Sequence, residues 1–236
     1  KTKSLILNYL ESFSPDHIYT FPESNNIIAE YFFSENGKTL LFRCDMDAVP
    51  VREELSIPYR SEVDTASHKC GHDGHVASML SFAKKISSKP FKTGRILLFF
   101  QEGEELGLGA QRLIDSNFLN SFSIDEVYAF HNIPEEPLHS IIVKEGSFSC
   151  SVISCDIELH GKTSHAAEPQ KGVSPLRAAE TIVNSILTLN NPNLDDESYR
   201  VVTLIEMRIG EQAYGVSAGN GVLRFTIRTY TDQKLQ

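Results

Sequence analysis

The stretch that decides the fold is ILLFFQEGEE, residues 96–105. Its five consecutive apolar residues, 96–100, are typical of a strand that is buried on both faces of a sheet. Two adjacent acids, Glu104 and Glu105, follow shortly after this strand. Because sites in open α/β sheets lie beyond the carboxyl ends of the strands, the stretch predicts both a sheet core and a place for polar chemistry beside it.

The segments around this strand alternate between helical and extended patterns. Apolar residues at helical spacing predict helices over 5–13, 74–86 and 110–114. Apolar runs predict strands over 26–33 and 127–130, and a turn at Asn36-Gly37 leads into a continuing strand over 39–43. We therefore expect residues 1–148 to form an α/β domain, with a mixed, mostly parallel sheet flanked by helices.

The pattern changes after residue 148. A long alternating strand is predicted over 152–159, and a helix begins at Ser174-Pro175 and runs to about residue 189. Two more strands follow, near 201–207 and 222–230. This order suggests the start of a smaller α+β domain of ferredoxin-like pattern over 149–236.

Composition narrows the classes of protein to which the chain can belong. The chain has 236 residues, of which 41% are hydrophobic and 22% charged, as in ordinary globular proteins. Its net charge of −9 and the lack of a basic stripe argue against a nucleic-acid partner. No apolar run approaches the about 18 residues that a membrane helix needs. Four cysteines and no secretion signal predict a cytoplasmic protein with reduced thiols.

Three predicted strands end in acids or a histidine. Asp45 and Asp47 follow the strand over 39–43, Glu104 and Glu105 follow the central strand, and His131 follows the strand over 127–130. These tails should converge at one edge of the sheet. Clustered carboxylates would repel one another without a positive group among them, so the pattern favours a divalent metal cluster. One of the adjacent glutamates can then bind a metal while the other accepts a proton from water.

A fourth segment is dense in possible metal ligands. Residues 68–75 read HKCGHDGH, directly before a predicted helix. Cys70 and His72 could bind one metal, and the helix N-terminus is expected to favour the thiolate of Cys70. The competing interpretation is a solvated polar loop, and for Glu104 and Glu105 an ordinary helix start. The coincidence of four such segments favours the metal.

Together these segments resemble the M20 metallopeptidase family, and specifically its amidohydrolase branch of aminoacylase-like enzymes, hippurate hydrolases and auxin-conjugate hydrolases. The matching segments occur in the family's order and span about residues 27–231. They are residues 43–50, 61–64, 68–75, 100–105, 131–134 and 161–169.

The resemblance implies a catalytic metal-binding domain over 1–148 and an inserted lid and dimerisation domain over 149–236. It also implies two divalent ions per subunit, with zinc as first choice and manganese, cobalt or nickel as possible alternatives. Cys70 would bridge the ions, and the further ligands would be His72, Glu105 and His131. Glu104 would be the general base, Asp47 would orient a ligand imidazole, and Arg228 would bind a substrate carboxylate. His165 would stabilise the oxyanion in the partner subunit of a homodimer.

The chain also departs from the family pattern. Family members are longer and take their last metal ligand, a histidine, from near the C-terminus, so the chain as given, which stops at Gln236, is expected to lack a complete site. Gly215 falls where the family usually has Asn. Glu102-Gly103 replaces the usual Pro-Ala, which is expected to add a negative charge at the site.

The favoured function is metal-dependent hydrolysis of the amide bond of N-acyl amino acids or related small amides. Two enzymatic alternatives are an M20-type dipeptidase and a thiol hydrolase with Cys70 as nucleophile and His72 or His75 as base. A non-catalytic binding or assembly protein is a fourth possibility, which the presence of a base and ligands opposes.

Overall fold

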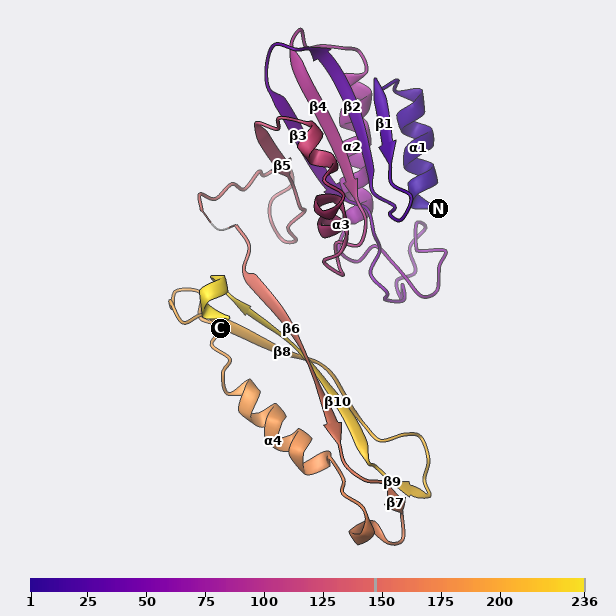
Figure 1. Cartoon of the computed structure of the whole chain (residues 1–236), viewed down its shortest axis with the longest axis vertical. Helices are drawn as coiled ribbons and strands as arrows, with labels where there is room; N and C mark the ends of the chain where they lie inside the picture. The colour runs from indigo at the N-terminus through magenta and orange to yellow at the C-terminus, as the bar shows by residue number, and fades with distance from the viewer. Residues whose placement is uncertain (147, 236) are drawn as a thin grey trace. The chain divides into compact units, whose positions relative to one another are not determined.

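The computed structural model describes residues 1–146 and 148–235. The chain divides into two compact units, Lys1–Leu138 and His139–Gln236 (Figure 1). None of the helices in the described ranges combines the length and the apolar character needed to cross a membrane.

The first unit is built on a five-stranded sheet. Its strands are β1 (His17–Thr20), β2 (Ile27–Ser34), β3 (Thr39–Asp45), β4 (Gly94–Gln101) and β5 (Glu126–Ala129), and their order in the sheet is β1-β2-β4-β3-β5. The apolar residues 96–100 of β4 are at most 6% exposed, which confirms that this strand is buried on both faces. Strand β1 has no counterpart in the sequence-based expectation.

The sheet is evenly mixed rather than mostly parallel, which corrects the expectation from the sequence. Strands β3 and β4 are parallel, as are β3 and β5. Strand β2 runs antiparallel to both β1 and β4. The difference arises because short connections from β1 to β2 and from β2 to β3 each reverse the chain, so that β2 runs opposite to β1 and also to β4, which is parallel to β3. Strand β4 also lies between β2 and β3, so that these two do not pair directly.

Alternate side chains of β4 point to two apolar cores. Helices α1 (Thr2–Ser12) and α2 (His72–Ile86) cover one face, where Ile96, Leu98 and Phe100 are buried against them (Figure 1). Helix α3 (Gly109–Asp115) and the 3-10 helix η1 (Phe118–Ser121) cover the other face, where Leu97 and Phe99 pack. Strand β4 is therefore held rigidly, and with it the start of the loop that follows.

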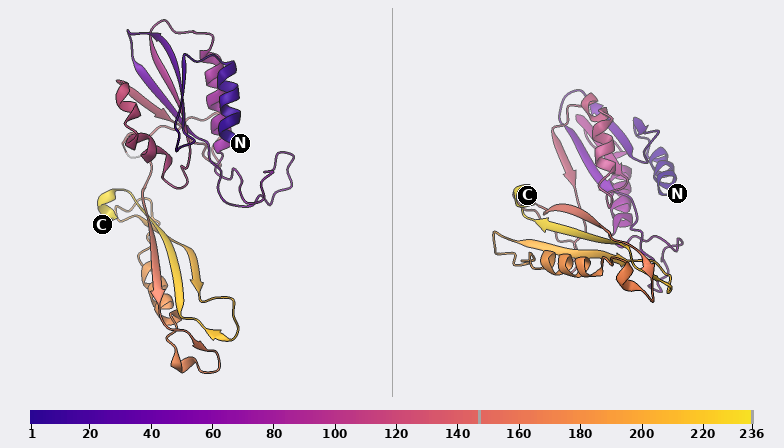
Figure 2. Two further views of the ribbon diagram at one scale, coloured as in Figure 1. Left: turned by 45° about the vertical axis from the view of Figure 1, so that its right-hand side comes forward. Right: turned by 60° about the horizontal axis from the view of Figure 1, so that its bottom comes forward.

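The second unit contains a three-stranded antiparallel sheet. Strands β6 (Ser151–His160), β10 (Asn220–Thr229) and β8 (Arg200–Ile209) lie in that order, and helix α4 (Leu176–Leu187) covers one face (Figure 2). The core between helix and sheet is centred on Ala179, Val202, Leu223 and Phe225. The remaining elements are β7 (Ser164–His165), paired with β9 (Val216–Ser217), and the 3-10 helices η2 (Pro169–Lys171) and η3 (Asp232–Lys234).

Candidate metal centre

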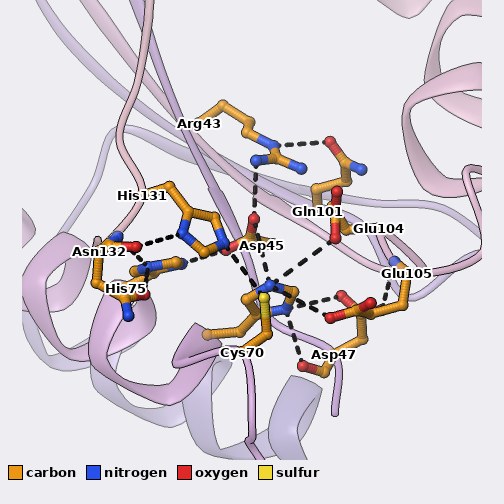
Figure 3. A network of polar contacts seen from close by, with 11 residues as sticks. Arg43, Asp45, Asp47, Cys70, His75, Gln101, Glu104, Glu105, His131 and Asn132 are labelled. Atoms are coloured by element: carbon orange, nitrogen blue, oxygen red, sulfur yellow. Dashed lines mark hydrogen bonds and ion pairs between the residues drawn. The ribbon is translucent and has the colours of Figure 1, made fainter. Parts of the chain in front are cut away.

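The strand tails of the first unit meet at one edge of its sheet. In the parallel pair β3 and β4, Cys44 lies opposite Phe100 and Asp45 opposite Gln101, so both strands end at the same level. Strand β5 ends beside them, since its Ala129 lies opposite Arg43. Helix α2 begins at His72 at this edge. The structure therefore brings together all the site residues predicted in residues 1–138, namely Asp47, Cys70, His72, Glu104, Glu105 and His131 (Figure 3).

His72 is fully buried at the middle of this group. Its Nδ1 lies 3.0 Å from the main-chain oxygen of Asp47 and 3.4 Å from the carboxylate of that residue. Because a carbonyl oxygen only accepts, Nδ1 donates, and the neutral ring carries its lone pair on Nε2. Among the described residues Nε2 has no hydrogen-bond partner. It lies 3.7–3.8 Å from carboxylate oxygens of Asp45, Glu104 and Glu105.

Cys70 and His131 face each other across the same centre. The Sγ atom of Cys70 is 3.3 Å from Nε2 of His131. The other ring nitrogen, Nδ1, lies 2.8 Å from the main-chain oxygen of Asn132 and donates to it. The lone pair of Nε2 in a neutral His131 ring is consequently directed at the sulfur.

Without a bound cation, the surroundings of Cys70 oppose ionisation of its thiol. Burial, a hydrogen bond with Glu105 and the charge of Glu104 raise the pKa of the thiol to about 11. Burial and the neighbouring acids thus act against the thiolate that the helix N-terminus is expected to favour.

The donors present fit a divalent cation. Donor atoms of Cys70, His72 and Glu105 lie within 4.8 Å of one another. Ligands of one tetrahedral zinc ion, bound at about 2.0–2.3 Å, lie roughly 3.3–3.8 Å apart. The buried Asp47 Oδ1 and His72 Nε2, both without partners in the described part of the chain, are atoms that a cation or its surroundings would satisfy. Sulfur, imidazole and carboxylate together suit borderline metals such as zinc.

Five residues without an assigned role in the favoured interpretation of the sequence form a polar network behind the centre. Two of them had been named, Asp45 among the converging acids and His75 as a base of the thiol-hydrolase alternative. Asp45 accepts hydrogen bonds from Arg43 Nη1 at 2.9 Å and from His75 Nδ1 at 2.5 Å. Burial alone would raise the pKa of Asp45, but the His75 hydrogen bond and the Arg43 charge hold it below its ordinary value. The other two members are Gln101 and Asn132. One signal was available, because His72 and His75 are three residues apart on one helix and so share a face.

Glu102 lies outside the centre. Its carboxylate accepts hydrogen bonds from Ser24 Oγ at 2.7 Å, Asn25 Nδ2 at 2.9 Å and Arg112 Nη1 at 2.9 Å. Burial opposes its ionisation, but these contacts outweigh burial and lower the pKa of Glu102 to about 2. The extra negative charge expected at the site is therefore paired with Arg112.

The last two predicted site residues belong to the second unit. His165 lies in β7 and is exposed, and its Nδ1 accepts a hydrogen bond from the main-chain N–H of Ala167 at 3.1 Å. A neutral His165 therefore carries its proton on Nε2. Arg228 lies near the end of β10, where its side chain is exposed.

The chain is similar to several known proteins. The chain is 30% identical over 211 residues to the N-acetylcysteine deacetylase of Bacillus subtilis, which covers 89% of the chain and 55% of that protein. It is 28% identical to the hippurate hydrolase of Campylobacter jejuni, over 98% of the chain and 60% of that protein. A Bacillus subtilis crystal structure described as a dinuclear metal-binding peptidase from the M20 family superposes with a TM-score of 0.68. That match has 26% identity and covers 100% of the chain and 60% of the other.

The chain thus spans a little over half the length of these relatives. The profile of peptidase family M20/M25/M40 matches residues 41–224, which include every segment of the candidate metal centre. The resemblance to the M20 amidohydrolase branch is confirmed by these relatives. The chain belongs to peptidase family M20/M25/M40.

Proposed function

We propose that the chain is part of a metal-dependent hydrolase that cleaves the amide bond of N-acyl amino acids or related small amides. The observation that carries this proposal is the buried Nε2 of His72, which has no partner in the described residues and faces three carboxylates close to a thiol. The names of the relatives, a deacetylase and a hippurate hydrolase, support the substrate class.

Four side chains are proposed to hold two divalent ions, with zinc as the first choice. Cys70 would bridge the ions, and His72, Glu105 and His131 would be further ligands. Ions bound here would supply Lewis acidity toward the scissile carbonyl and would acidify water. The Asp47 main-chain oxygen fixes the tautomer of His72 that leaves Nε2 available, as partners of ligand imidazoles commonly do.

Glu104 is proposed to move the proton. Its side chain is 39% exposed, so it is accessible to water and substrate while one oxygen lies 3.8 Å from His72. A carboxylate in this position would accept a proton from the attacking water and deliver it to the leaving amine nitrogen.

The second unit is proposed to act as a lid, with residues 1–148 as the catalytic domain and 149–236 as an inserted lid and dimerisation domain. His165, with its Nε2 proton exposed, would donate a hydrogen bond to the oxyanion in the partner subunit of a homodimer. Arg228 would bind the carboxylate of the substrate.

The test is a Glu104→Gln variant of the whole protein, assayed with N-acetyl and N-benzoyl amino acids. We expect kcat to fall by about 10²–10⁴-fold, because the base is lost, while the metal content by elemental analysis stays near the wild-type value. The matched control is Glu11→Gln, an exposed position in α1. Unchanged turnover in Glu104→Gln, or a wild-type protein that binds no divalent metal, would contradict the proposal.

The same assay separates the two enzymatic alternatives. A dipeptidase would cleave unblocked dipeptides in preference to N-acyl amino acids. A thiol hydrolase would keep its activity after chelation, whereas the proposed enzyme would lose it and recover it with added metal. The raised pKa of Cys70 supports a metal ligand over a free nucleophile, since a protonated thiol is a weak nucleophile.

A further inference from the structure

A buried polar network runs behind the candidate metal centre and ends at one of its ligands. Asp45 is fully buried and His75 is 2% exposed. The network proceeds from Arg43 to Asp45, from Asp45 to His75, and from His75 to Asn132, which adjoins His131 (Figure 3). Gln101 closes its outer end by accepting a hydrogen bond from Arg43 Nε at 2.8 Å.

A contribution to folding stability does not by itself explain why these polar side chains are buried together. A buried charged pair is often no more stabilising than apolar side chains of the same volume, because both charges lose their hydration. The site offers a reason, since each contact orients the next group toward the centre.

His75 is held by hydrogen bonds at both ring nitrogens. Asp45 Oδ1 accepts from Nδ1, so in the neutral ring Nε2 is an acceptor. The main-chain N–H of Asn132 donates to Nε2 at 3.1 Å. The side-chain Oδ1 of Asn132 also lies 2.7 Å from Nε2, and a flip of this amide, which exchanges its oxygen and nitrogen, would turn the NH₂ toward the acceptor Nε2. His75 therefore has no lone pair left for a metal, although it belongs to a group of possible ligands with Asp45, His72 and His131.

His75 and His131 bind the two peptide groups on either side of the Asn132 Cα. The N–H of Asn132 is fixed by His75, and the oxygen of Asn132 accepts from His131 Nδ1 at 2.8 Å. The ring of His75 also packs against that of His131, with centroids 4.6 Å apart. The outcome is a His131 ring whose Nε2 faces Cys70 Sγ at 3.3 Å.

We propose that Asp45 and His75 are positioning residues, which hold Asn132 in place and through its main chain aim His131 at the metal centre. The carboxylate of Asp45 sets the tautomer of His75, and Arg43 compensates the carboxylate charge. This inference rests on the proposed function, because it assigns the network its role through a metal ligand.

The test compares zinc affinity and histidine tautomers in the whole protein. Affinity for Zn²⁺ is measured by competition with a chromophoric chelator, and ring tautomers are read from ¹⁵N NMR of the metal-free protein. We expect His75→Phe, which keeps an aromatic ring but makes neither hydrogen bond, to weaken zinc binding by about 10–100-fold. We also expect His131 to lose its single Nδ1–H tautomer. The control is His160→Phe, whose side chain is 80% exposed in the wild-type protein.

A second variant keeps the proposal testable if His75→Phe does not fold. Asp45→Asn keeps the shape of the side chain, and we expect it to mix the tautomers of His75 and to weaken zinc binding in the same direction. Wild-type affinity in both variants, with His131 still a single Nδ1–H tautomer, would overturn the positioning role. If the wild-type protein itself binds no zinc, the proposed function fails, and the dependence of the His131 tautomer on His75 still decides the positioning role.

Discussion

Glu102-Gly103 stands where the family usually has Pro-Ala, directly before Glu104 and Glu105. Replacing Glu102 by Gln tests whether the glutamate at this position stabilises the fold. The side chain of Glu102 is 12% exposed, and its pKa is lowered from the ordinary 4.5 to about 2. A difference of this size corresponds to about 3 kcal/mol of folding free energy. Because the pKa is lower in the folded protein, this stabilisation is complete above about pH 4.5 and is lost as the pH falls toward 2.

Glutamine keeps the length of the side chain but has one acceptor oxygen, so it can replace either Oε1, which accepts from Ser24 and Arg112, or Oε2, which accepts from Asn25, and it has no charge to pair with Arg112. At pH 7 we therefore expect Glu102→Gln to lower the free energy of unfolding of the first unit by about 1–3 kcal/mol. The difference from the wild-type protein should shrink as the pH is lowered below 4.5.

The measurement is equilibrium urea unfolding at pH 7 and pH 3.5, followed by a brief hydrogen-exchange pulse and mass spectrometry of peptides from β4. These peptides report the first unit specifically, which matters because a chain with two units need not unfold in one step. The control is Glu180→Gln, which removes an exposed ion pair with Arg177 in α4. A destabilisation of Glu102→Gln that is equal at both pH values would refute the charge-based reasoning, and no destabilisation at pH 7 would refute the pairing itself.

Three further perturbations address other parts of the structure. Gly71→Ala should lower the melting temperature and weaken zinc binding, because φ at this position is +89° and the added methyl group would lie 2.6 Å from Asn132 Oδ1; differential scanning fluorimetry and chelator competition measure the two effects. Removing metal with a chelator should lower the melting temperature, and zinc at about 100 times its Kd should restore about 2.7 kcal/mol of stability, whereas equal melting curves would count against a metal centre. Phe225→Ala should destabilise the second unit by about 3–5 kcal/mol, seen as faster hydrogen exchange in peptides of β8 and β10, since Phe225 is 1% exposed in its core.

The sequence predicted those features that depend on short stretches of chain. Strand β4 is marked by five consecutive apolar residues, and the convergence of the strand tails follows from parallel pairing with β3. Strand β1 has only four residues and pairs on one side, so no alternation distinguishes it from a loop. The evenly mixed sheet was missed for the same reason, because half of the antiparallel pairing involves β1.

Features that depend on distant residues could not be predicted from one sequence. The carboxylate of Glu102 is paired with Arg112 and accepts a hydrogen bond from Ser24, which lies 78 residues earlier in the chain. Asp45 meets His75 across 30 residues. In both cases the residue types were visible, but their pairing is set by packing of elements whose relative placement no local pattern specifies.

The acids that add to the effect of burial in raising the pKa of Cys70 also surround Nε2 of His72. Several acids are gathered around a thiol and a neutral imidazole with no cationic side chain of the described residues in direct contact with either. Arg43 donates its hydrogen bonds to Asp45 and Gln101. Such an arrangement disfavours a thiolate when the protein stands alone and favours it when a cation is bound, because the same carboxylates then attract the cation. Metal binding should therefore release the thiol proton, and the affinity of the centre for zinc should rise with pH.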